Sequence, residues 1–416
     1  MSTPITLLEK RRILLGVTGS IAAYKAADLA SKLTQTGALV DVIMTAAAQR
    51  FISPLTFQAL TGRTVYTDLW QTESDGGLPT HIAHVGLAEG ASALLIAPAT
   101  ADTIARIAHG FASDLLAITA LAARCPTVIA PAMDGGMYEH DAVQTNLALL
   151  RQRGVLVIEP EEGRFASGLT GRGRLPETST LIGALRYGLG RGGALAKRRI
   201  IVTAGGTREA IDPVRYLTNR SSGKQGYALA GACLDAGADV ILITAARGLD
   251  APYGAQIIPV DSAKQMHDAV LSAAAGADAL IMAAAVADFR PASVAEQKIK
   301  KLEQAEAPTL VLERTPDILA SVRERRQDTG YPRVVVGFAA ESKNVREYAR
   351  DKLVKKGLDL IVANDITASD AGFDADTNRV TIYDRDSGEE FLDLTSKARI
   401  SEAIIGRVAA LLAEKG

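Results

Sequence analysis

The feature that most restricts the fold of this chain is a regular alternation of short apolar runs with longer Ala- and Leu-rich stretches. In the first half, the runs that read as strands cover residues 13–17, 39–44, 93–97, 127–130 and 155–158. The stretches that read as helices cover residues 20–35, 47–60, 101–108, 113–123 and 142–152. Continuously apolar strands separated by helices are typical of parallel sheets with helices on both faces. The first half is therefore predicted to be a doubly wound α/β domain.

The second half repeats this alternation and departs from it only near its end. Its predicted strands lie near residues 199–203, 239–244, 279–283, 333–337 and 359–362, and its predicted helices near 224–236, 263–275, 315–325 and 344–356. Residues 379–383 and 390–392 flank a turn-like segment, which predicts a β-hairpin before a final helix over 396–414. We expect a second doubly wound domain with a terminal hairpin.

The chain begins a strand in the same way twice, with a basic pair, an apolar run and a glycine turn. Arg11-Arg12-Ile13-Leu14-Leu15 is echoed by Arg198-Arg199-Ile200-Ile201-Val202. A chain of 416 residues is also too long for one ordinary core. The glycine-rich segment Gly188 to Gly193 is the best linker candidate. The predicted domains are residues 1–190 and 191–416.

The composition limits the classes of partner. The net charge is −1, which argues against a broad surface for nucleic acid or anionic membrane. Cys125 and Cys233 lie far apart in apolar surroundings, which predicts neither a disulfide nor a zinc site and indicates a reducing compartment. No apolar run reaches the roughly 18 residues of a membrane span, and Met1 to Lys10 lacks the apolar core of a signal peptide. The expected location is the cytoplasm.

Residues 203–226 form a connection that is far more polar than joining a strand to a helix requires. Two glycine turns, the tetrad Ser221-Ser222-Gly223-Lys224, Arg215 and Asn219 all follow the apolar run 200–202. Backbone N–H groups freed by glycine at the start of a helix make an anion site, and a lysine adds a mobile charge. The Walker pattern is excluded because Gln225 follows Gly223-Lys224. The alternatives are a phosphate-binding turn and an ordinary strand-to-helix connection.

The loops at the carboxyl ends of the first-half strands are the places where a doubly wound sheet binds ligands. The turn Gly16 to Ser20 lacks the Gly-x-Gly-x-x-Gly spacing, and Thr45 stands where a dinucleotide site has an acidic residue. A mononucleotide phosphate held by Ser20 and the helix start fits better. Two further unusual turns, residues 97–103 and 131–138, follow the next strands.

Together these turns resemble a known family, the bifunctional bacterial phosphopantothenoylcysteine decarboxylases and phosphopantothenate–cysteine ligases of coenzyme A biosynthesis. In the first half, residues 97–101 are similar to its flavin-binding turn, residues 131–138 to its substrate-binding turn, and His84 falls at its active-site histidine. The second-half motifs occur in the family's order: 203–205, 212–215, Asn219, 221–224, 284–289, 298–301, 337–341 and 363–365. The likeness covers nearly the whole chain and implies a flavodoxin-like flavin domain followed by a nucleotide-binding ligase domain.

The resemblance implies the chemistry of the second half. A carboxylate reacts with an amine only when one of its oxygens can leave. The resemblance therefore implies that the carboxylate of 4′-phosphopantothenate reacts with CTP to give an acyl-cytidylate and pyrophosphate. The amine of cysteine then displaces CMP. Phosphate charge calls for donors, lysines and Mg²⁺, with Asp288 as the metal residue. Asn219 is expected to handle the acyl-cytidylate, Lys298 to serve the attack by cysteine, and Arg215 to bind substrate.

The residues that the resemblance assigns to CTP are Ser221, Ser222, Gly223, Ala287, Asp288, Phe289, Lys298, Pro316, Asp317, Ile318, Phe338, Lys352 and Lys356. Lys352 and Lys356 are one helical turn apart, and a solvated basic face is the open alternative for them. The run from Lys298 to Lys301 alone would also be read as solvated surface.

In the first half, the resemblance implies that FMN oxidises the substrate thiol to a thioaldehyde, that CO₂ departs, and that the hydride is returned. His84 is the expected base, because a histidine suits proton transfer at neutral pH, and His81 is the alternative. The residues assigned to FMN are Gly19, Ser20, Thr45, Pro98, Thr100 and Ser113. The residues assigned to substrate are Met133, Asp134, Ser167, Arg172 and Arg174.

Two positions depart from the family pattern. Asp134 stands where many members have asparagine, and an ionised aspartate repels a substrate carboxylate at hydrogen-bond distance. Either Asp134 is protonated in the closed site or another donor takes its place. The flap, residues 163–175, has Ser167 and no cysteine, although a flap cysteine donates the last proton in enteric-type members. Ser167 is far less acidic than a thiol and cannot simply take over that step.

Three functions therefore stay open from the sequence. The first is the complete bifunctional enzyme, and the second is an active ligase whose N-terminal domain is a flavin-binding scaffold or regulatory module. A nicotinamide oxidoreductase, the third, is weakened by Thr45 at the ribose-binding position. The resemblance also implies a homo-oligomer, with ligase domains as dimers and flavin domains as trimers or dodecamers.

Overall fold

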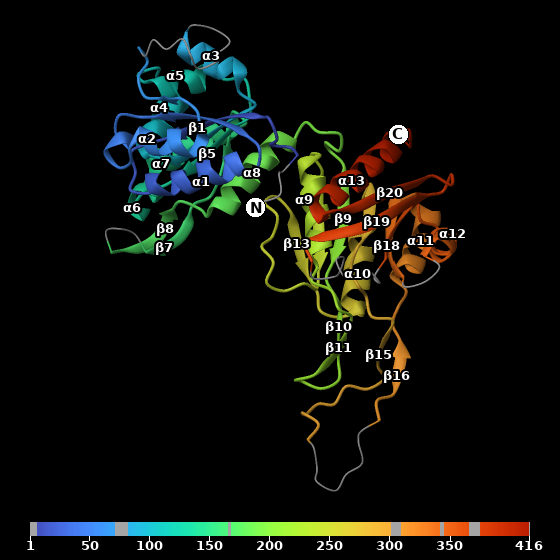
Figure 1. Cartoon of the computed structure of the whole chain (residues 1–416). Helices are drawn as coiled ribbons and strands as arrows, with labels where there is room; N and C mark the ends of the chain where they lie inside the picture. Colours follow the sequence, from blue (N-terminus) through green and yellow to red (C-terminus); the bar gives the residue numbers. More distant parts are fainter. Residues whose placement is uncertain are drawn as a thin grey trace. The chain divides into compact units, whose positions relative to one another are not determined.

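The structure, a computed structural model, describes residues 6–70, 82–164, 168–300, 309–341, 345–365 and 375–415. The chain forms two compact units, residues 1–190 and 191–416, each of which is an α/β unit (Figure 1). Within the described ranges, no helix is both long enough and apolar enough to cross a membrane.

The N-terminal unit is built on a parallel six-stranded sheet in the order β3-β2-β1-β4-β5-β6. The strands are β1 (Arg12–Val17), β2 (Leu39–Met44), β3 (Val65–Tyr66), β4 (Ala93–Ala99), β5 (Thr127–Pro131) and β6 (Leu156–Val157). Without the two-residue edge strand β3, the order is that of a flavodoxin, in which the ligand lies where the strand order reverses. The predicted doubly wound sheet is confirmed, whereas β3 was not predicted because it is too short to give a pattern.

Helices cover both faces of this sheet. They are α1 (Ala23–Gln35), the 3₁₀ turn η1 (Ala48–Arg50), α2 (Pro54–Thr61), α3 (Ala83–Gly90), α4 (Ala101–His109), α5 (Leu115–Ala122), α6 (Gly135–Glu139), α7 (Asp141–Gln152) and α8 (Thr178–Gly190). α1 contacts α2 and α8 on one face, while α3, α4, α5 and α7 share a core cluster with the strands on the other. A hairpin of β7 (Glu161–Arg164) and β8 (Thr170–Arg174) forms the flap.

The predicted glycine linker is corrected by the structure at its start. Helix α8 continues to Gly190, so residues 188–190 of the predicted linker are helical. Its buried Leu181, Ala184 and Leu185 lie on the side that packs against the sheet. Glycine residues disfavour a helix in an isolated segment. Here the burial of these three side chains stabilises the helix as far as Gly190.

The C-terminal unit contains an eight-stranded sheet in the order β13-β12-β9-β14-β17-β18-β19-β20. The strands are β9 (Arg199–Ala204), β12 (Asp239–Thr244), β13 (Gln256–Pro259), β14 (Ala279–Met282), β17 (Val334–Glu341), β18 (Leu360–Asp365), β19 (Thr377–Asp384) and β20 (Glu389–Ser396). The pairings are parallel as far as β18, and the hairpin β19–β20 continues the sheet in antiparallel fashion. The predicted terminal hairpin is thus part of the main sheet.

In the part of this unit that the structure describes, five helices cover the two faces of the sheet. They are α9 (Lys224–Asp235), α10 (Ala263–Ala274), α11 (Ile318–Thr329), α12 (Val345–Lys355) and α13 (Lys397–Glu414). α9 packs on α13, whereas α10, α11 and α12 contribute to the core cluster on the opposite face. Two short ribbons, β10 (Arg208–Ala210) with β11 (Tyr216–Thr218) and β15 (Phe289–Pro291) with β16 (Leu312–Arg314), form an arm that extends from the sheet (Figure 1). The sequence patterns did not predict the arm, because each of its strands has only three residues.

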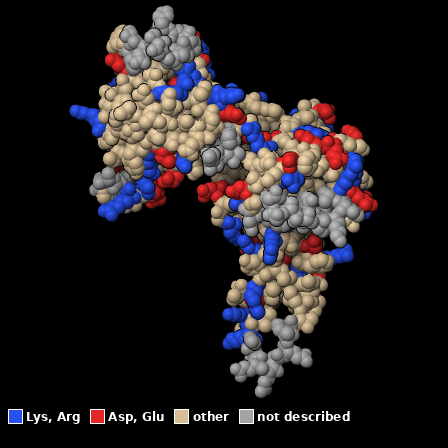
Figure 2. All heavy atoms as spheres, viewed as in Figure 1, with Lys and Arg blue, Asp and Glu red and all other residues tan. Residues whose placement is uncertain are grey.

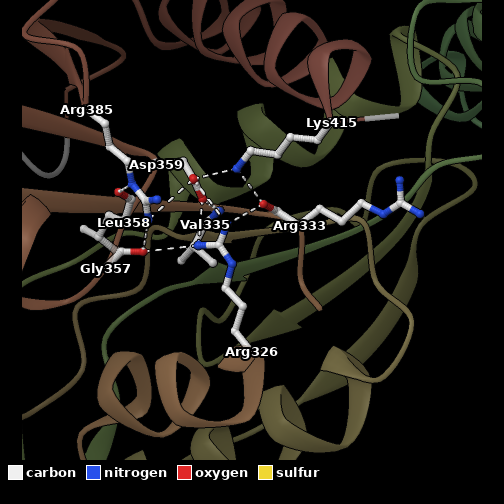
Figure 3. A network of polar contacts seen from close by, with 8 residues as sticks. All are labelled: Arg326, Arg333, Val335, Gly357, Leu358, Asp359, Arg385 and Lys415. Atoms are coloured by element: carbon white, nitrogen blue, oxygen red, sulfur yellow. Dashed lines mark hydrogen bonds and ion pairs between the residues drawn. The ribbon is translucent and has the colours of Figure 1, made fainter. Parts of the chain in front are cut away.

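The buried carboxylate of Asp359 joins four elements of this unit (Figure 3). It accepts the N–H of Val335 at 2.8 Å and pairs with Arg326 of α11 at 2.9 Å, with Lys415 at the end of α13 at 2.7 Å and with Arg385 of the β19–β20 turn at 3.6 Å. Burial alone raises the pKa of Asp359, but the hydrogen bonds from Arg326 and Lys415 outweigh it, and the pKa lies below its usual value. One carboxylate thereby ties the last helix to the sheet.

Candidate active sites

The connection from β9 to α9 is a glycine turn that lies against the next loop of the sheet. Gly205 has φ +83°, and a Cβ there would lie 2.3 Å from the backbone nitrogen of Ala246. Gly223 has φ +79° and occupies the N-cap of α9 without a side-chain cap. The first N–H groups of α9 are therefore not capped by that residue, which is the arrangement that binds anions at a helix start.

A second turn, residues 283–289, lies beside the first and is fixed by side chains from three segments. Thr207 Oγ1 accepts the N–H of Ala287 at 2.9 Å, and Thr315 Oγ1 donates to its carbonyl at 2.6 Å. Asn219 Nδ2 donates to the carbonyl of Val286 at 3.1 Å. Because Asn219 belongs to the first turn, this bond locks the two turns together.

Two adjoining cavities lie over these turns, and we call them cavity A and cavity B. Cavity A, of about 510 Å³, surrounds the start of α9, and cavity B, of about 460 Å³, lies between residues 287–289 and the start of α11. Both cavities are lined by Ala284, Val286, Asp288, Phe338 and Lys352. The two cavities therefore form one continuous site across the carboxyl ends of β9, β14 and β17.

Lysine side chains from different elements lie around the continuous site. Lys352 Nζ donates to the carbonyl of Phe338 at 2.9 Å, and Lys356 forms an ion pair with Asp317, the N-cap of α11. Burial raises the pKa of Asp317. The hydrogen bonds from Lys356 and from the N–H of Ala320 lower it by more, so that the pKa lies below its usual value. Lys224 pairs with Asp376 at 2.7 Å. Two of these lysines are paired with carboxylates, and Lys352 is bound to a carbonyl at the junction of the two cavities.

Most residues that the sequence assigned to CTP line this continuous site. Cavity A is lined by Ser221, Ser222 and Gly223, cavity B by Ala287, Phe289, Pro316, Asp317, Ile318 and Lys356, and both by Asp288, Phe338 and Lys352. Asn219, predicted as a catalytic residue, also lines cavity A. Arg215 instead lines a separate cavity of about 570 Å³ beside the arm. Lys298 is exposed on the segment after β15 and, among the described residues, does not line cavity A or B.

Sequence reasoning missed several polar residues of cavity A. Gln225, Asn364, Asn378 and Lys397 line it, and Gln225 Oε1 and Asn364 Oδ1 are buried acceptors to which no described residue donates. Asn364 lies in a motif that carried the family resemblance, which was the available signal. Asn378 and Lys397 had none, because only the antiparallel addition of β19 brings them to the site.

The N-terminal unit has its own cavity, cavity C, of about 490 Å³. Six predicted residues line it, namely Gly19, Ser20, Thr100, Met133, Asp134 and Arg174. A Cβ on Gly19 would lie 2.4 Å from the Cβ of Ala47, so glycine is required for the close approach of the two turns. Tyr24, Lys25, Met137 and Arg164, which were not predicted as site residues, also line the cavity, and the flap segment 163–175 was the signal for Arg164.

Hydrogen bonds fix the turns around cavity C. Thr18 Oγ1 donates to the carbonyl of Pro98 at 2.7 Å and accepts the N–H of Thr100 at 3.0 Å. Thr100 caps α4, and Asp134 caps α6 by accepting the N–H of Gly136 at 3.2 Å. Met133 donates its N–H to the carbonyl of Gly173 in β8 at 3.0 Å, which attaches the flap to the cavity.

Other predicted residues of the N-terminal unit do not line cavity C as the structure describes it. His84 is half-buried on α3, and Thr45 Oγ1 accepts the N–H of Ala48 at 3.2 Å. Ser113 is exposed and accepts a hydrogen bond from Arg106 at 2.5 Å, and Arg172 is exposed on β8. Pro98 contributes through its carbonyl bond to Thr18. His81 and Ser167 lie outside the described residues.

The described residues contain no group of three or more His, Cys, Asp or Glu side chains that could hold a metal ion. Asp288 stands as a single carboxylate in the wall shared by cavities A and B. Both signs of charge are interspersed over the face seen in Figure 2, in keeping with the net charge of −1.

Two family models match the chain: "Flavoprotein" over residues 1–187 and "DNA/pantothenate metabolism flavoprotein C-terminal domain" over residues 195–412. The "Coenzyme A biosynthesis bifunctional protein CoaBC" of Bacillus subtilis (strain 168) is 47% identical over 413 residues, which are 99% of this chain and 99% of that protein. The protein of the same name from Vibrio vulnificus (strain YJ016) is 44% identical over 405 residues, covering 97% of this chain and 99% of its own length.

Among solved structures, the "C-terminal Domain of Coenzyme A biosynthesis bifunctional protein CoaBC" is 38% identical with a TM-score of 0.45, and the match covers 54% of this chain and 100% of that one. The family argument rests on the full-length relatives and on the two family models, which divide between the two units. The chain belongs to the CoaBC family of bifunctional coenzyme A biosynthesis proteins, in which a flavoprotein decarboxylase domain precedes a phosphopantothenate–cysteine ligase domain.

Proposed function

We propose that the C-terminal unit activates 4′-phosphopantothenate with CTP and couples it to cysteine, and that the N-terminal unit uses FMN to decarboxylate the product to 4′-phosphopantetheine. The observation that carries the ligase half is the continuity of cavities A and B through Asp288, Phe338 and Lys352. A triphosphate and the carboxylate that it activates must meet in one site, and this continuity provides it.

In this proposal cytosine lies in cavity B against residues 287–289, and the phosphates extend toward cavity A. The uncapped start of α9, Ser221 and Ser222 supply N–H and hydroxyl donors, and Lys352 supplies charge at the junction. Donors aimed at phosphate oxygens stabilise the charge that develops as pyrophosphate leaves. Asn219, held by Val286, is then adjacent to the carboxylate carbon.

Asp288 fits a magnesium ion that is bound together with the nucleotide. Mg²⁺ commonly takes one or two protein carboxylates and completes its shell with phosphates and water. A single carboxylate in a wall common to both cavities meets that requirement. The ion would neutralise phosphate charge, while the residues of the chain orient the reactants.

Lys298 is proposed to serve the attack by cysteine on the evidence of family membership alone, because it does not line either cavity among the described residues. Lys298→Gln should let the acyl-cytidylate persist, and Asn219→Asp should impair its turnover. Mass spectrometry of the reaction mixture measures both effects. Normal turnover by both variants would remove these two role assignments.

Cavity C fits FMN in size and lining. Its volume of about 490 Å³ lies within the range of about 300–1,000 Å³ that is usual for cofactor pockets. Ser20 and the start of α1 provide donors for a phosphate, Lys25 and Arg174 provide charge, and Ile21 and Met137 provide apolar wall. Bound flavin supplies a group that accepts and returns a hydride. The chain would bind the substrate at Met133 and Asp134, and His84 is the proposed base.

Exposed apolar side chains support the proposal of a homo-oligomer. On the arm, Val214 is 59% exposed and Val311 is 67% exposed. Around cavity C, Ile21 is 60% exposed and Tyr24 is 62% exposed. Dimers of the ligase unit and trimers or dodecamers of the flavin unit would cover these side chains. We also propose a cytoplasmic location from the use of cysteine.

The decisive experiment is incubation of the full chain, reconstituted with FMN, with 4′-phosphopantothenate, cysteine, CTP and Mg²⁺. The proposal expects 4′-phosphopantetheine and CO₂. Accumulation of phosphopantothenoylcysteine without CO₂ would instead favour the ligase with a flavin-binding scaffold, in keeping with the missing flap cysteine. Absence of any ligated product would overturn the proposal.

A further inference from the structure

The turn between β10 and β11 is organised around the carboxylate of Asp212, whose side chain has 0% exposure. Asp212 Oδ1 accepts the backbone N–H groups of Val214 and Arg215, each at 2.8 Å. Asp212 Oδ2 accepts Arg215 Nε at 3.0 Å and Arg215 Nη2 at 2.5 Å. The two oxygens thus have separate tasks, because Oδ1 holds the turn and Oδ2 holds the guanidinium.

The same carboxylate also holds the segment that carries Lys298. Asp212 Oδ2 accepts the N–H of Ile299 at 3.1 Å, although the two residues are 87 positions apart. Arg215 Nη2 donates to the carbonyl of Ile299 at 3.0 Å. Both backbone groups of Ile299 are therefore bound, and its neighbour Lys298 is placed by these bonds. Nearby, the N–H of Ala295 donates to the carbonyl of Ile211 at 3.0 Å, which adds a second attachment.

Charge makes this junction strong and directional. The hydrogen bond from Arg215 holds the pKa of Asp212 well below its usual range, against the opposing effect of burial. The ionised carboxylate can accept from the guanidinium and from the Ile299 N–H at once, and charge-assisted bonds of this kind are about twice as strong as neutral ones. Arg215 itself remains 47% exposed and accessible to a substrate.

We propose that Asp212 is a positioning residue of the ligase reaction, which fixes the substrate-binding Arg215 and the Lys298 segment relative to each other. The arm of Figure 1 is then an element that couples substrate capture to the attack by cysteine. The inference rests on the proposed function, which takes Lys298 to act on the ligase substrates, and on the family resemblance, which assigns Arg215 to substrate although Arg215 lines a cavity separate from cavities A and B. Asp212 itself touches neither reactant and acts only through these two residues.

The test is Asp212→Asn in the full chain. In the variant, the amide oxygen still accepts the N–H groups of the turn in place of Oδ1. The NH₂ group replaces Oδ2 and cannot accept from Arg215 or Ile299, so only the contacts of Oδ2 are lost. We expect the KM for 4′-phosphopantothenate to rise roughly tenfold, because the loss of one charge-assisted contact changes a binding constant by about this factor. We also expect the acyl-cytidylate to accumulate, as for Lys298→Gln, when reactions with CTP, Mg²⁺ and cysteine are quenched and analysed by mass.

Asp359→Asn is the matched control, because Asp359 is also buried, paired with arginine and part of the same unit. It should lower the melting temperature but leave the KM and the ratio of acyl-cytidylate to product unchanged. Ile299→Pro is the second variant: it removes the N–H that Asp212 accepts, on a partly exposed residue, and its ring also restricts the backbone of Lys298. It should let the intermediate accumulate at an unchanged KM, because the contact between Asp212 and Arg215 stays.

The outcomes separate the inference from the proposed function. If the wild-type chain forms no acyl-cytidylate, both are wrong. If the wild type forms and consumes it, and Asp212→Asn does so with the same KM and the same ratio of intermediate to product, only the positioning role is wrong. The positioning role is also wrong if Asp212→Asn lowers the melting temperature and slows the formation of the acyl-cytidylate and its reaction with cysteine to the same extent, because a purely structural residue would give this result. Should Asp212→Asn fail to fold, the intermediate ratio of Ile299→Pro decides.

Discussion

Buried aspartates act as junctions between distant segments in both units. Asp41 on β2 has 1% exposure and pairs with Arg12 and Arg63, in the way that Asp359 pairs with Arg326 and Lys415. A buried charge is tolerated only when it is paired and hydrogen-bonded, so each of these carboxylates depends on cations from several elements. Removing one carboxylate leaves its cations without their buried partner.

Asp359→Asn should therefore destabilise the C-terminal unit by about 3 kcal/mol at pH 7. The pKa of Asp359 is lowered in the folded state, so its contribution is fully present above the unfolded value of about 3.9 and is lost as the pH falls through the folded value. The stability difference between wild type and variant should be constant above about pH 5 and should shrink below about pH 4. Thermal or urea unfolding across this range measures it.

Asp268→Asn provides the exposed comparison, since Asp268 pairs with Lys264 on the surface of α10. Exposed pairs contribute little, and this variant should unfold almost as the wild type does. An Asp359→Asn protein that is as stable as Asp268→Asn at pH 7 would show that the network of Figure 3 is not a stabilising junction.

At the scale of elements, the turn from β9 to α9 depends on backbone conformation as much as on side chains. Gly205 lies in the left-handed region and within van der Waals contact of the loop after β12. Gly223, the N-cap of α9, lies against the same loop, and the start of α9 lines cavity A. The element is a binding site only while the loop stays in place.

Gly205→Ala should abolish CTP binding and lower stability, because the new Cβ would lie 2.3 Å from the backbone nitrogen of Ala246 and that backbone has to move. Gly248→Ala is the matched control, since Gly248 has φ +73° and open space around its Cβ position. It should cost about 1 kcal/mol of stability from the left-handed conformation alone and leave binding intact. Calorimetric titration with CTP and Mg²⁺ compares them, and equal binding by both variants would contradict the role of the turn.

At the scale of the whole molecule, each unit contains its own cavity and its own core. Cavity C is lined by residues from 19 to 175, and cavities A and B by residues from 219 to 397. The described walls of each cavity thus come from one unit, and the two activities should be separable by substitution.

Lys352→Ala should reduce ligation at least about tenfold, because a charge at the junction of cavities A and B is lost. Decarboxylation of phosphopantothenoylcysteine supplied from outside should be unchanged. Lys355→Ala on the same helix is the control, since Lys355 is 75% exposed and pairs with Asp351. Separate assays of product formation and CO₂ release measure both halves. Parallel loss of the two activities in Lys352→Ala would contradict separable sites.

The sequence by itself determined the two doubly wound sheets, the terminal hairpin and the turns that form the cavities. Long apolar runs and glycine turns are local signals, and each of them constrains the backbone where it stands. The turns that hold Ser20, Thr100 and Ser221 were predicted in this way, whereas Asp288 and the ligands of all four residues were assigned by the family resemblance. The described structure brings all four to a cavity wall.

Only the tertiary structure decided the contacts between distant segments. Nothing local in the sequence indicates that Asp212 holds Ile299, that Asp359 holds Lys415, or that Asn378 reaches cavity A. The three-residue strands of the arm and the continuation of α8 through its glycines likewise depend on packing with other elements. Such contacts arise from the free energy of burial and pairing across the fold, which no window of neighbouring residues contains.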